Sequence, residues 1–242
     1  MRTIKLAVLG LFAAGAALGL AAIPASAQTL QVSVDSFKNG GAMPNQYAFC
    51  VPAAQGHTQP GLNINPRISW SKGPAGTKSY AIILYDTDSP AAQREKMNQE
   101  GMTLTTDVPR RNFYHWVLIN IPASVTSVAK GEDSNARVVH GKPQTPAKVG
   151  LRGLNSYTQA TASNPQMAGA YFGYDGPCPP WNDEQPHHYH FTVYALSVKE
   201  LNIGGAFDAT AAMAAIQGKV LAQGEALGLY SQNPAVIAKL PK

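Results

Sequence analysis

Three stretches of the chain are apolar over the length of a β-strand: residues 80–85, 116–121 and 191–196. Strands with apolar side chains on both faces are typical of the middle of a sheet that is covered on both sides. Polar residues precede the third stretch, and alternation along it places Tyr189 on one face and His188 on the other. The pattern therefore predicts three central strands, each with polar residues at one end.

Weaker patterns flank these strands. Alternating polar and apolar residues indicate half-buried strands, and stretches dense in Gly, Pro, Asn and Gln indicate loops. An Ala-rich stretch that Asp208 or Thr210 can cap indicates a helix that Gly218 ends. The expected elements are strands at 30–37 and 67–70, an edge strand at 124–128, loops at 43–66 and 130–171, a short helix at 91–99, a helix at 206–217, and either a helix or a strand at 220–230. This order favours a mainly β, mostly antiparallel fold in one domain, with small peripheral helices near the C-terminus.

A polar insert, residues 91–112, joins the end of the first central strand to the start of the second. Because it connects two strand ends that carry polar clusters, we expect it at the mouth of any pocket that these clusters form. It is then either a rim or lid of that pocket or a solvated surface loop.

The N-terminus has the order of residues found in a secretory signal. Two basic residues precede an apolar run at 6–23, and the small-x-small sequence at 25–27 is the form that signal peptidases cleave. We therefore expect a signal peptide at 1–27, a mature domain at 28–242, and a periplasmic or secreted location. An uncleaved membrane anchor is the alternative, because the apolar run is long for a signal core.

Composition indicates which kinds of partner the mature chain can bind and whether its cysteines are paired. Removing the two basic residues of the signal leaves 17 Lys and Arg against 14 Asp and Glu, a net charge of +3. No run of basic residues forms a stripe, so we expect no nucleic acid partner. The two cysteines, Cys50 and Cys178, are an even count in an exported chain, which favours a disulfide. Two buried free thiols are the alternative.

Polar clusters stand at the ends of the three central strands. Asp86 and Asp88 follow the first, His115 precedes the second, and His187 begins the third, with Tyr189 close behind. If these ends converge, their side chains surround one cavity. The ring N–H groups of His115 and His187 can donate to a small anion, while Asp86 can accept from a histidine and fix its tautomer. The cluster therefore predicts an anion pocket that needs no cofactor.

Two other kinds of site are less well supported. The chain has no Gly-x-Ser-x-Gly elbow and no cysteine beside a plausible base, which argues against a serine or cysteine hydrolase. His188 and His190 share a strand face and are candidate metal ligands, but His187 points the other way, so the three cannot serve one ion. We expect His188 and His190 on the outer face of a sheet. A hydrolase with a His/Asp site is a third, weaker functional hypothesis.

Four motifs follow one another along the chain: Asp86-Thr87-Asp88-Ser89-Pro90, His115-Trp116-Val117-Leu118-Ile119-Asn120-Ile121-Pro122, Gly173-Tyr174-Asp175-Gly176-Pro177-Cys178-Pro179-Pro180, and His187-His188-Tyr189. Together they resemble the phosphatidylethanolamine-binding protein family, and most of all its bacterial, Raf kinase inhibitor-like branch. The resemblance runs from about residue 32 to 230. It departs from the family pattern at Thr87 and Ser89, which replace Pro and Ala, and at His188, which replaces Arg.

The resemblance implies a fold of two antiparallel sheets and a pocket for phosphate-like head groups. The ligand-binding residues that it implies are Asp86, Asp88, His115, Gly176, Pro177, His187 and Tyr189. The expected function is that of an exported, non-catalytic binding protein for a small anionic or phosphate-bearing ligand. The alternative is a protein-interaction module that inhibits a protease or a kinase through the pocket rim and the insert 91–112. A homodimer is compatible with either function.

Overall fold

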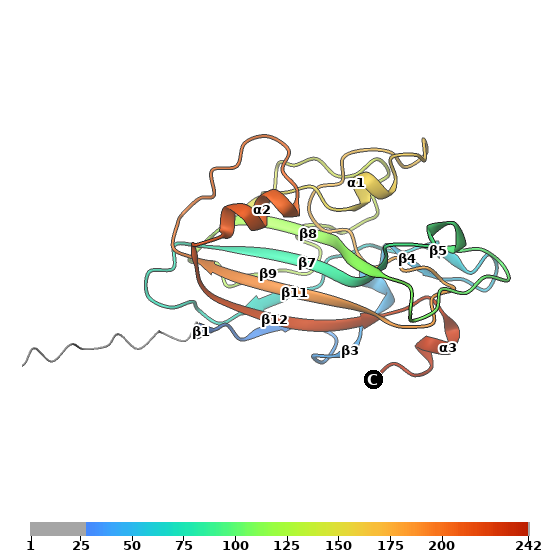
Figure 1. The fold of residues 1–242 in the computed structure, drawn as a ribbon. Helices are drawn as coiled ribbons and strands as arrows, with labels where there is room; N and C mark the ends of the chain where they lie inside the picture. The colour runs from blue at the N-terminus through green and yellow to red at the C-terminus, as the bar shows by residue number, and fades with distance from the viewer. Residues whose placement is uncertain (1–27, 242) are drawn as a thin grey trace, which may run out of the picture.

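The computed structural model describes residues 28–241, so the predicted signal peptide at 1–27 lies outside the described residues. Its main element is a seven-stranded sheet in the order β1-β12-β11-β7-β8-β10, with β3 also paired to β12 (Figure 1). The strands are β1 (Gln28–Thr29), β3 (Gly41–Ala42), β7 (Ser79–Pro90), β8 (Arg110–Pro122), β10 (Leu151–Arg152), β11 (His187–Leu196) and β12 (Val220–Tyr230). The three predicted central strands are confirmed as β7, β8 and β11.

Strand β11 lies between β7 and β12 and pairs antiparallel with both. The stretch that the sequence left open, 220–230, is therefore a strand and not a helix. Two glycines allow β12 to lie close to its neighbours. A Cβ on Gly224 would come within 2.0 Å of the Leu30 carbonyl oxygen, and one on Gly228 within 2.5 Å of the Met43 side chain. The short strands β1 and β3 pair with β12 in parallel, so the sheet is mostly, but not wholly, antiparallel.

A smaller sheet of β2 (Val32–Val34), β6 (Ile68–Trp70) and β9 (Ser127–Val128) packs against one face of the main sheet. Between them lies the larger core, to which Trp70, Ile82, Leu118 and Phe191 contribute fully or almost fully buried side chains. Two mostly antiparallel sheets that pack face to face agree with the expected fold class.

The other face of the main sheet is covered by α2 (Ala209–Ile216), as Figure 1 shows. Asp208 caps this helix, since its Oδ1 accepts a hydrogen bond of 2.9 Å from the Ala211 amide. Two single-turn helices, α1 (Tyr157–Ala160) and α3 (Pro234–Ile237), complete the periphery. In the described part of the chain, no helix is long and apolar enough to cross a membrane.

The predicted loop at 43–66 is wrong in part, because it contains a 3-10 turn, η1 (Asn45–Tyr47), and a hairpin of β4 (Cys50–Pro52) and β5 (Thr58–Pro60). Its three β5 residues are all exposed, so no apolar alternation could have indicated a strand. The hairpin is held by contacts from elsewhere: the amides of Phe49 and Cys50 both donate to the Pro177 carbonyl.

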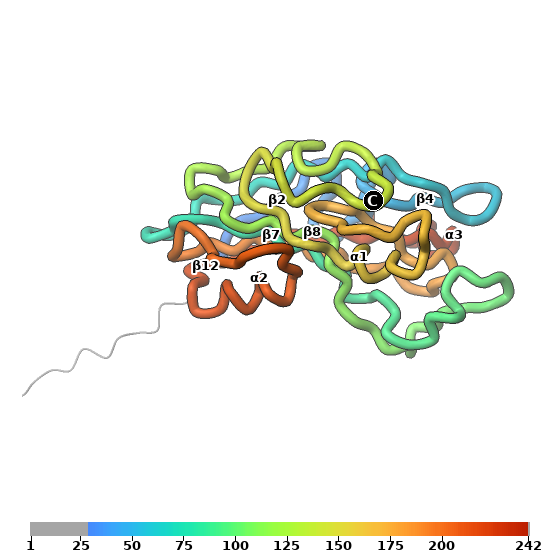
Figure 2. The backbone as a smooth tube through the Cα atoms, turned by 90° about the horizontal axis from the view of Figure 1, so that it is seen from above, coloured from blue at the N-terminus to red at the C-terminus, as the bar shows by residue number. Residues whose placement is uncertain are grey.

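The insert 91–112 is the tip of a long hairpin, because β7 continues to Pro90 and β8 begins at Arg110. In Figure 2 its green trace projects to one side of the sheet. The predicted helix at 91–99 is wrong. Gln93 and Asn98 have positive φ angles of 54° and 57°, so only a 3-10 turn, η2 (Arg94–Lys96), forms between them.

The insert is fixed to the body of the protein. The Asn182 side-chain amide donates to the carbonyls of Lys96 and Met102, at 2.8 and 3.1 Å, and its oxygen accepts from the Asn98 amide. Within the insert, Leu104 is fully buried. The insert is therefore a rim anchored to the body of the protein, although most of its residues are exposed.

Candidate functional site

Asp86, His115 and His187 meet at one end of the main sheet, as the sequence predicts. They surround a small cavity of about 120 Å³. Strand pairing brings them together, since β7 lies between β8 and β11 and Asp86 is opposite Tyr189 in the ladder. The other lining residues are Ser89, Pro90, Arg94, Met97, Arg111, Phe113, Tyr157, Ala160, Cys178, Pro179 and Pro180.

The His187 ring is held between two carboxylates. Its Nδ1 lies 2.7 Å from Asp86 Oδ2 and its Nε2 lies 3.2 Å from Asp183 Oδ2. Burial lowers the pKa of His187, but the two carboxylates outweigh burial and raise the pKa to about 9. The ring is therefore a cation at neutral pH, with both N–H groups donated to protein. This differs from the expectation that His187 donates to a ligand, and it confirms that Asp86 orients a histidine.

Asp183 continues this chain of charges. It accepts two hydrogen bonds from the guanidinium of Arg110, from Nη1 at 2.5 Å and from Nη2 at 3.1 Å. Burial raises the pKa of Asp183, yet the bonds from His187 and Arg110 lower it below its usual value. The sequence analysis missed both residues. Asp183 lies in a proline-flanked loop without periodicity, so no pattern in the sequence indicated its contact with His187.

His115, unlike His187, is neutral at neutral pH. Burial lowers its pKa to about 4, against smaller opposing effects from Asp86 and from a hydrogen bond with Asp175. Its Nδ1 lies 2.8 Å from the Asp175 carbonyl oxygen, which can only accept, so Nδ1 carries the proton of the neutral ring. Nε2 is left with its lone pair toward the cavity. His115 thus offers a hydrogen-bond acceptor and not the donor that the sequence analysis expected.

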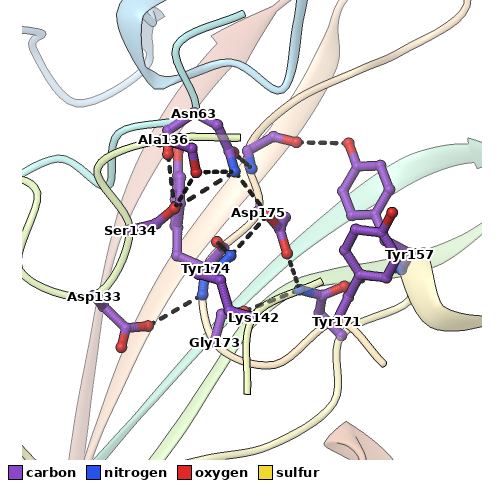
Figure 3. Close-up of polar contacts among 12 residues, drawn as sticks. Asn63, Asp133, Ser134, Ala136, Lys142, Tyr157, Tyr171, Gly173, Tyr174 and Asp175 are labelled. Carbon is purple, nitrogen blue, oxygen red and sulfur yellow. Dashed lines mark hydrogen bonds and ion pairs between the residues drawn. The ribbon is translucent and has the colours of Figure 1, made fainter. Parts of the chain in front are cut away.

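A buried polar network fixes the segment that holds His115 (Figure 3). The fully buried Asp175 side chain accepts from Asn63 at 2.7 Å, from Lys142 at 2.8 Å and from Asn155 at 2.8 Å. Burial raises the pKa of Asp175, and these partners act against it. Because three buried donors hold the Asp175 side chain, its backbone carbonyl keeps a fixed position against Nδ1 of His115.

The proline-rich wall of the cavity is formed by Cys178, Pro179 and Pro180. Gly176 and Pro177, which precede this wall in the chain, do not line the cavity. A Cβ on Gly176 would come within 1.8 Å of the Tyr47 carbonyl oxygen, so the close chain crossing there requires glycine. Cys178 forms a disulfide with Cys50, which confirms the expected pairing and ties the wall to the hairpin of β4 and β5.

Asp88 and Tyr189 are close to the cavity but do not line it. Asp88 Oδ2 accepts from the backbone amide and from the ring of His188, both at 2.9 Å. His188 and His190 are partly exposed on the outer face of β11, as expected. The Tyr189 ring packs edge-on against His115, with 5.2 Å between ring centroids, and its buried hydroxyl has no hydrogen-bond partner in residues 28–241.

Two arginines of the insert, Arg94 and Arg111, stand at the mouth of the cavity. Both are exposed, and neither forms an ion pair within the described residues. The charges deeper in the site balance, because Asp86 and Asp183 face His187 and Arg110. The mouth of the cavity is therefore positively charged, whereas the buried side chains below it carry no net charge.

Over residues 28–241, no group of three or more His, Cys, Asp or Glu side chains has an arrangement that could hold a metal ion. The histidines that share a strand face are engaged with carboxylates, His188 with Asp88 and His190 with Glu225.

Proteins of two bacteria are similar to this chain over most of its length. It is 29% identical over 205 residues to a UPF0098 protein of Aquifex aeolicus, covering 84% of this chain and 90% of that protein. It is 29% identical over 181 residues to the UPF0098 protein YbcL of Escherichia coli, covering 74% of this chain and 75% of that protein.

Solved structures show a related fold. The crystal structure of E. coli YbcL, described as a member of the mammalian PEBP family, aligns with a TM-score of 0.58 at 25% identity, over 84% of this chain and 99% of that one. The homologue CT736 of Chlamydia trachomatis aligns with a TM-score of 0.55 at 24% identity, over 84% and 97%, which supports the fold. The family model for phosphatidylethanolamine-binding protein matches residues 33–231. The chain therefore belongs to the phosphatidylethanolamine-binding protein family.

Proposed function

We propose that the protein is an exported, non-catalytic binding protein whose cavity takes a phosphate-bearing or similar small anionic group. The observation that carries this proposal is the charge pattern of the site. Arg94 and Arg111 stand unpaired, within the described residues, at the mouth of a cavity whose buried charges cancel. An entering anion therefore meets two guanidinium groups, which suit the geometry of phosphate oxygens.

The neutral His115 ring decides which anions fit best. An oxygen that approaches its Nε2 must bring a proton, or the ring must take one up, since Nδ1 already donates to the Asp175 carbonyl. A phosphate group meets this requirement, because the second ionisation of a phosphate ester has a pKa of about 6 and the group keeps a proton in mildly acidic solution. Sulfate, of similar shape, carries no such proton. The site is thus suited to a protonated phosphate.

Isothermal titration of the mature protein with inorganic phosphate tests the proposal. Affinity should rise as the pH falls from 8 to 6, because binding takes up or retains a proton, and sulfate should bind at least tenfold more weakly than phosphate at pH 6. Phosphate binding without pH dependence, or sulfate binding of equal strength, contradicts the role given to His115.

His115→Asn is the matching variant. Asparagine can still donate to the Asp175 carbonyl but leaves nothing at the position of Nε2. A hydrogen bond to a charged group contributes about 1.5–3 kcal/mol, so the affinity for phosphate should fall about 10- to 100-fold. His140→Asn is the control, since His140 also bonds a backbone carbonyl through Nδ1, that of Ala168, but is exposed and distant from the cavity lining. Unchanged affinity in His115→Asn would reject the site.

Export and the lack of catalysis are separate parts of the proposal. The signal-like order of residues 1–27 supports export, and N-terminal sequencing of protein recovered outside the cytoplasm should begin at Gln28. The absence of a recognisable nucleophile motif supports a binding role. A panel of esters and phosphoesters should show no turnover, and turnover that His115→Asn abolishes would instead favour the His/Asp hydrolase hypothesis.

A second candidate function is inhibition of a protease or kinase through the rim. It is favoured by the fixed insert, which presents Met102, half-exposed, at its tip. Deletion of the whole insert would also remove Arg94 and the buried Leu104. Met102→Asp is therefore the sharper test: it should weaken binding to a protein partner while leaving phosphate affinity unchanged.

A further inference from the structure

A second, larger cavity of about 290 Å³ lies beside the first. It is enclosed by the start of β8, by α1 and the segment before it, and by the first turn of α2. None of the four motifs that resemble the family contributes a residue to this cavity.

The two cavities share a wall. Arg94, Arg111, Phe113 and Ala160 line both of them. The two arginines that stand at the mouth of the small cavity are thus also at the entrance of the large one. A phosphate held between these guanidinium groups would have one side toward His115 and the other toward the second cavity. Together the two cavities reach the size of ordinary small-molecule pockets, about 300–1,000 Å³.

We propose that the larger cavity is the subsite for a hydroxyl-rich group, such as a sugar or a polyol, joined to the phosphate bound at the arginines. This inference rests on the proposed function and names the class of ligand: a phosphate ester of a polyhydroxylated ring or chain.

The polar side chains of the larger cavity favour a hydroxyl-rich group over an apolar one. Asn112, Gln159 and Thr210 make no side-chain hydrogen bond with any residue in 28–241, so their donors and acceptors remain for a ligand. Asp208 uses only Oδ1 for its cap on α2, which leaves Oδ2 to accept from a hydroxyl. An acyl or alkyl group placed here would cover these polar groups without replacing their bonds to water, which is unfavourable.

The polar surface of the larger cavity exceeds its apolar surface, so the apolar lining does not reverse this preference. Leu154 and Ala209 contribute aliphatic surface, and Phe113 and Tyr114 contribute ring surface. Flat ring faces among hydrogen-bonding side chains are also suited to the C–H face of a sugar. An extended lipid chain would need a continuous apolar channel.

Two matched probes test the inference by isothermal titration of the mature protein. Inositol 1-phosphate and cyclohexyl phosphate both carry a six-membered carbon ring, and only the first has hydroxyls. We expect inositol 1-phosphate to bind at least tenfold more tightly than inorganic phosphate, and cyclohexyl phosphate to show no such gain.

A variant that blocks the larger cavity tests whether that cavity provides the gain in affinity for inositol 1-phosphate. Thr210 is exposed in the first turn of α2 and lines only the larger cavity, so Thr210→Trp should remove the advantage of inositol 1-phosphate and leave the affinity for inorganic phosphate unchanged. Gln217→Trp, exposed at the other end of the same helix, should leave both affinities as in the wild type. Circular dichroism of each variant checks that the fold is retained.

The outcomes separate this inference from the proposed function. Equal affinity of inorganic phosphate and inositol 1-phosphate overturns the inference and leaves the phosphate pocket standing. A gain for cyclohexyl phosphate that Thr210→Trp abolishes overturns the hydroxyl-rich class. No binding of any phosphate overturns both.

Discussion

His115 and His187 face the same cavity, and burial acts to lower the pKa of each. At neutral pH, however, His187 is a cation and His115 is neutral. His187 has a carboxylate on each ring nitrogen, and its pKa is raised to about 9. His115 has a backbone carbonyl on one nitrogen and the rings of Phe113 and Tyr189 around it, and its pKa is lowered to about 4.

The difference shows that burial alone does not decide the state of a histidine in such a pocket. Two full negative charges overcome desolvation, whereas one carbonyl dipole and a more distant carboxylate do not. The charged ring then organises the floor of the site, and the neutral ring is left with a lone pair for a ligand. One residue type therefore holds two carboxylates together on one wall and leaves a free hydrogen-bond acceptor on the other.

The largest effect should follow removal of the charged ring. His187→Ala leaves Asp86 and Asp183 buried close together without the cation between them, and breaking a buried ion pair in this way costs about 3–5 kcal/mol. Urea unfolding should show this loss in the free energy of unfolding. His190→Ala, which removes a partly exposed ring bonded to Glu225, is the control and should cost less than about 1 kcal/mol. Equal losses in the two variants would contradict the comparison.

The two rings should also limit the stability of the protein at opposite ends of the pH range, His187 at alkaline pH and His115 at acid pH. The pKa of His187 is raised above its unfolded value, so its contribution is complete below pH 6.5 and is lost as the pH rises through about 9. The pKa of His115 is lowered, so its contribution is present above pH 6.5 and is lost as the pH falls toward about 4. Each shift corresponds to about 3 kcal/mol across its window.

Unfolding measured from pH 4 to 10 checks these limits. His115→Asn should flatten the acid side of the profile only, and His187→Gln the alkaline side only. A titration of the two rings by NMR that gave them similar pKa values would remove the basis of the comparison.

A smaller effect should follow a change one step further from the cavity. Arg110→Gln removes the two hydrogen bonds that Arg110 donates to Asp183, and those that it donates to the backbone carbonyls of Asp88, Thr105 and Val108. It leaves the contact of Asp183 with His187. The free energy of unfolding should fall by about 2 kcal/mol, as for hydrogen bonds to a charged group. The pKa of His187 should rise further, because the positive charge nearest Asp183 is gone. A fall in that pKa would show that the chain of charges is not coupled as the distances indicate.

Much of the fold follows from the sequence because its central strands are buried on both faces. Ile82, Ile83, Val117 and Leu118 can lie only in the interior, so their apolar runs mark the middle of the sheet. The same runs place Asp86, His115 and His187 at strand ends, which explains why these three could be predicted. Hydrophobic periodicity gave no such signal for the exposed strand β5 or for the short turn η2.

The rest of the site depends on contacts that no local pattern encodes. Asp183 and Arg110 meet through a loop and a strand start that are 73 residues apart. The charge of each histidine depends on whether a carboxylate or a carbonyl lies opposite its nitrogen, a difference of a few ångströms. That Cys178 lines the cavity, and Gly176 does not, depends on a chain crossing with Tyr47.

The disulfide has a consequence for a molecule whose backbone is cut. It joins residues 128 positions apart, and the covalent ring so formed contains Asp86, His115 and the whole insert, whereas His187 lies outside it. One cleavage at the exposed tip of the insert would leave two fragments connected through sulfur and still paired along β7, β8 and β11. Such a nicked molecule should keep a working pocket for as long as its surroundings remain oxidising, and should come apart into two peptides only when a reductant and a denaturant act together.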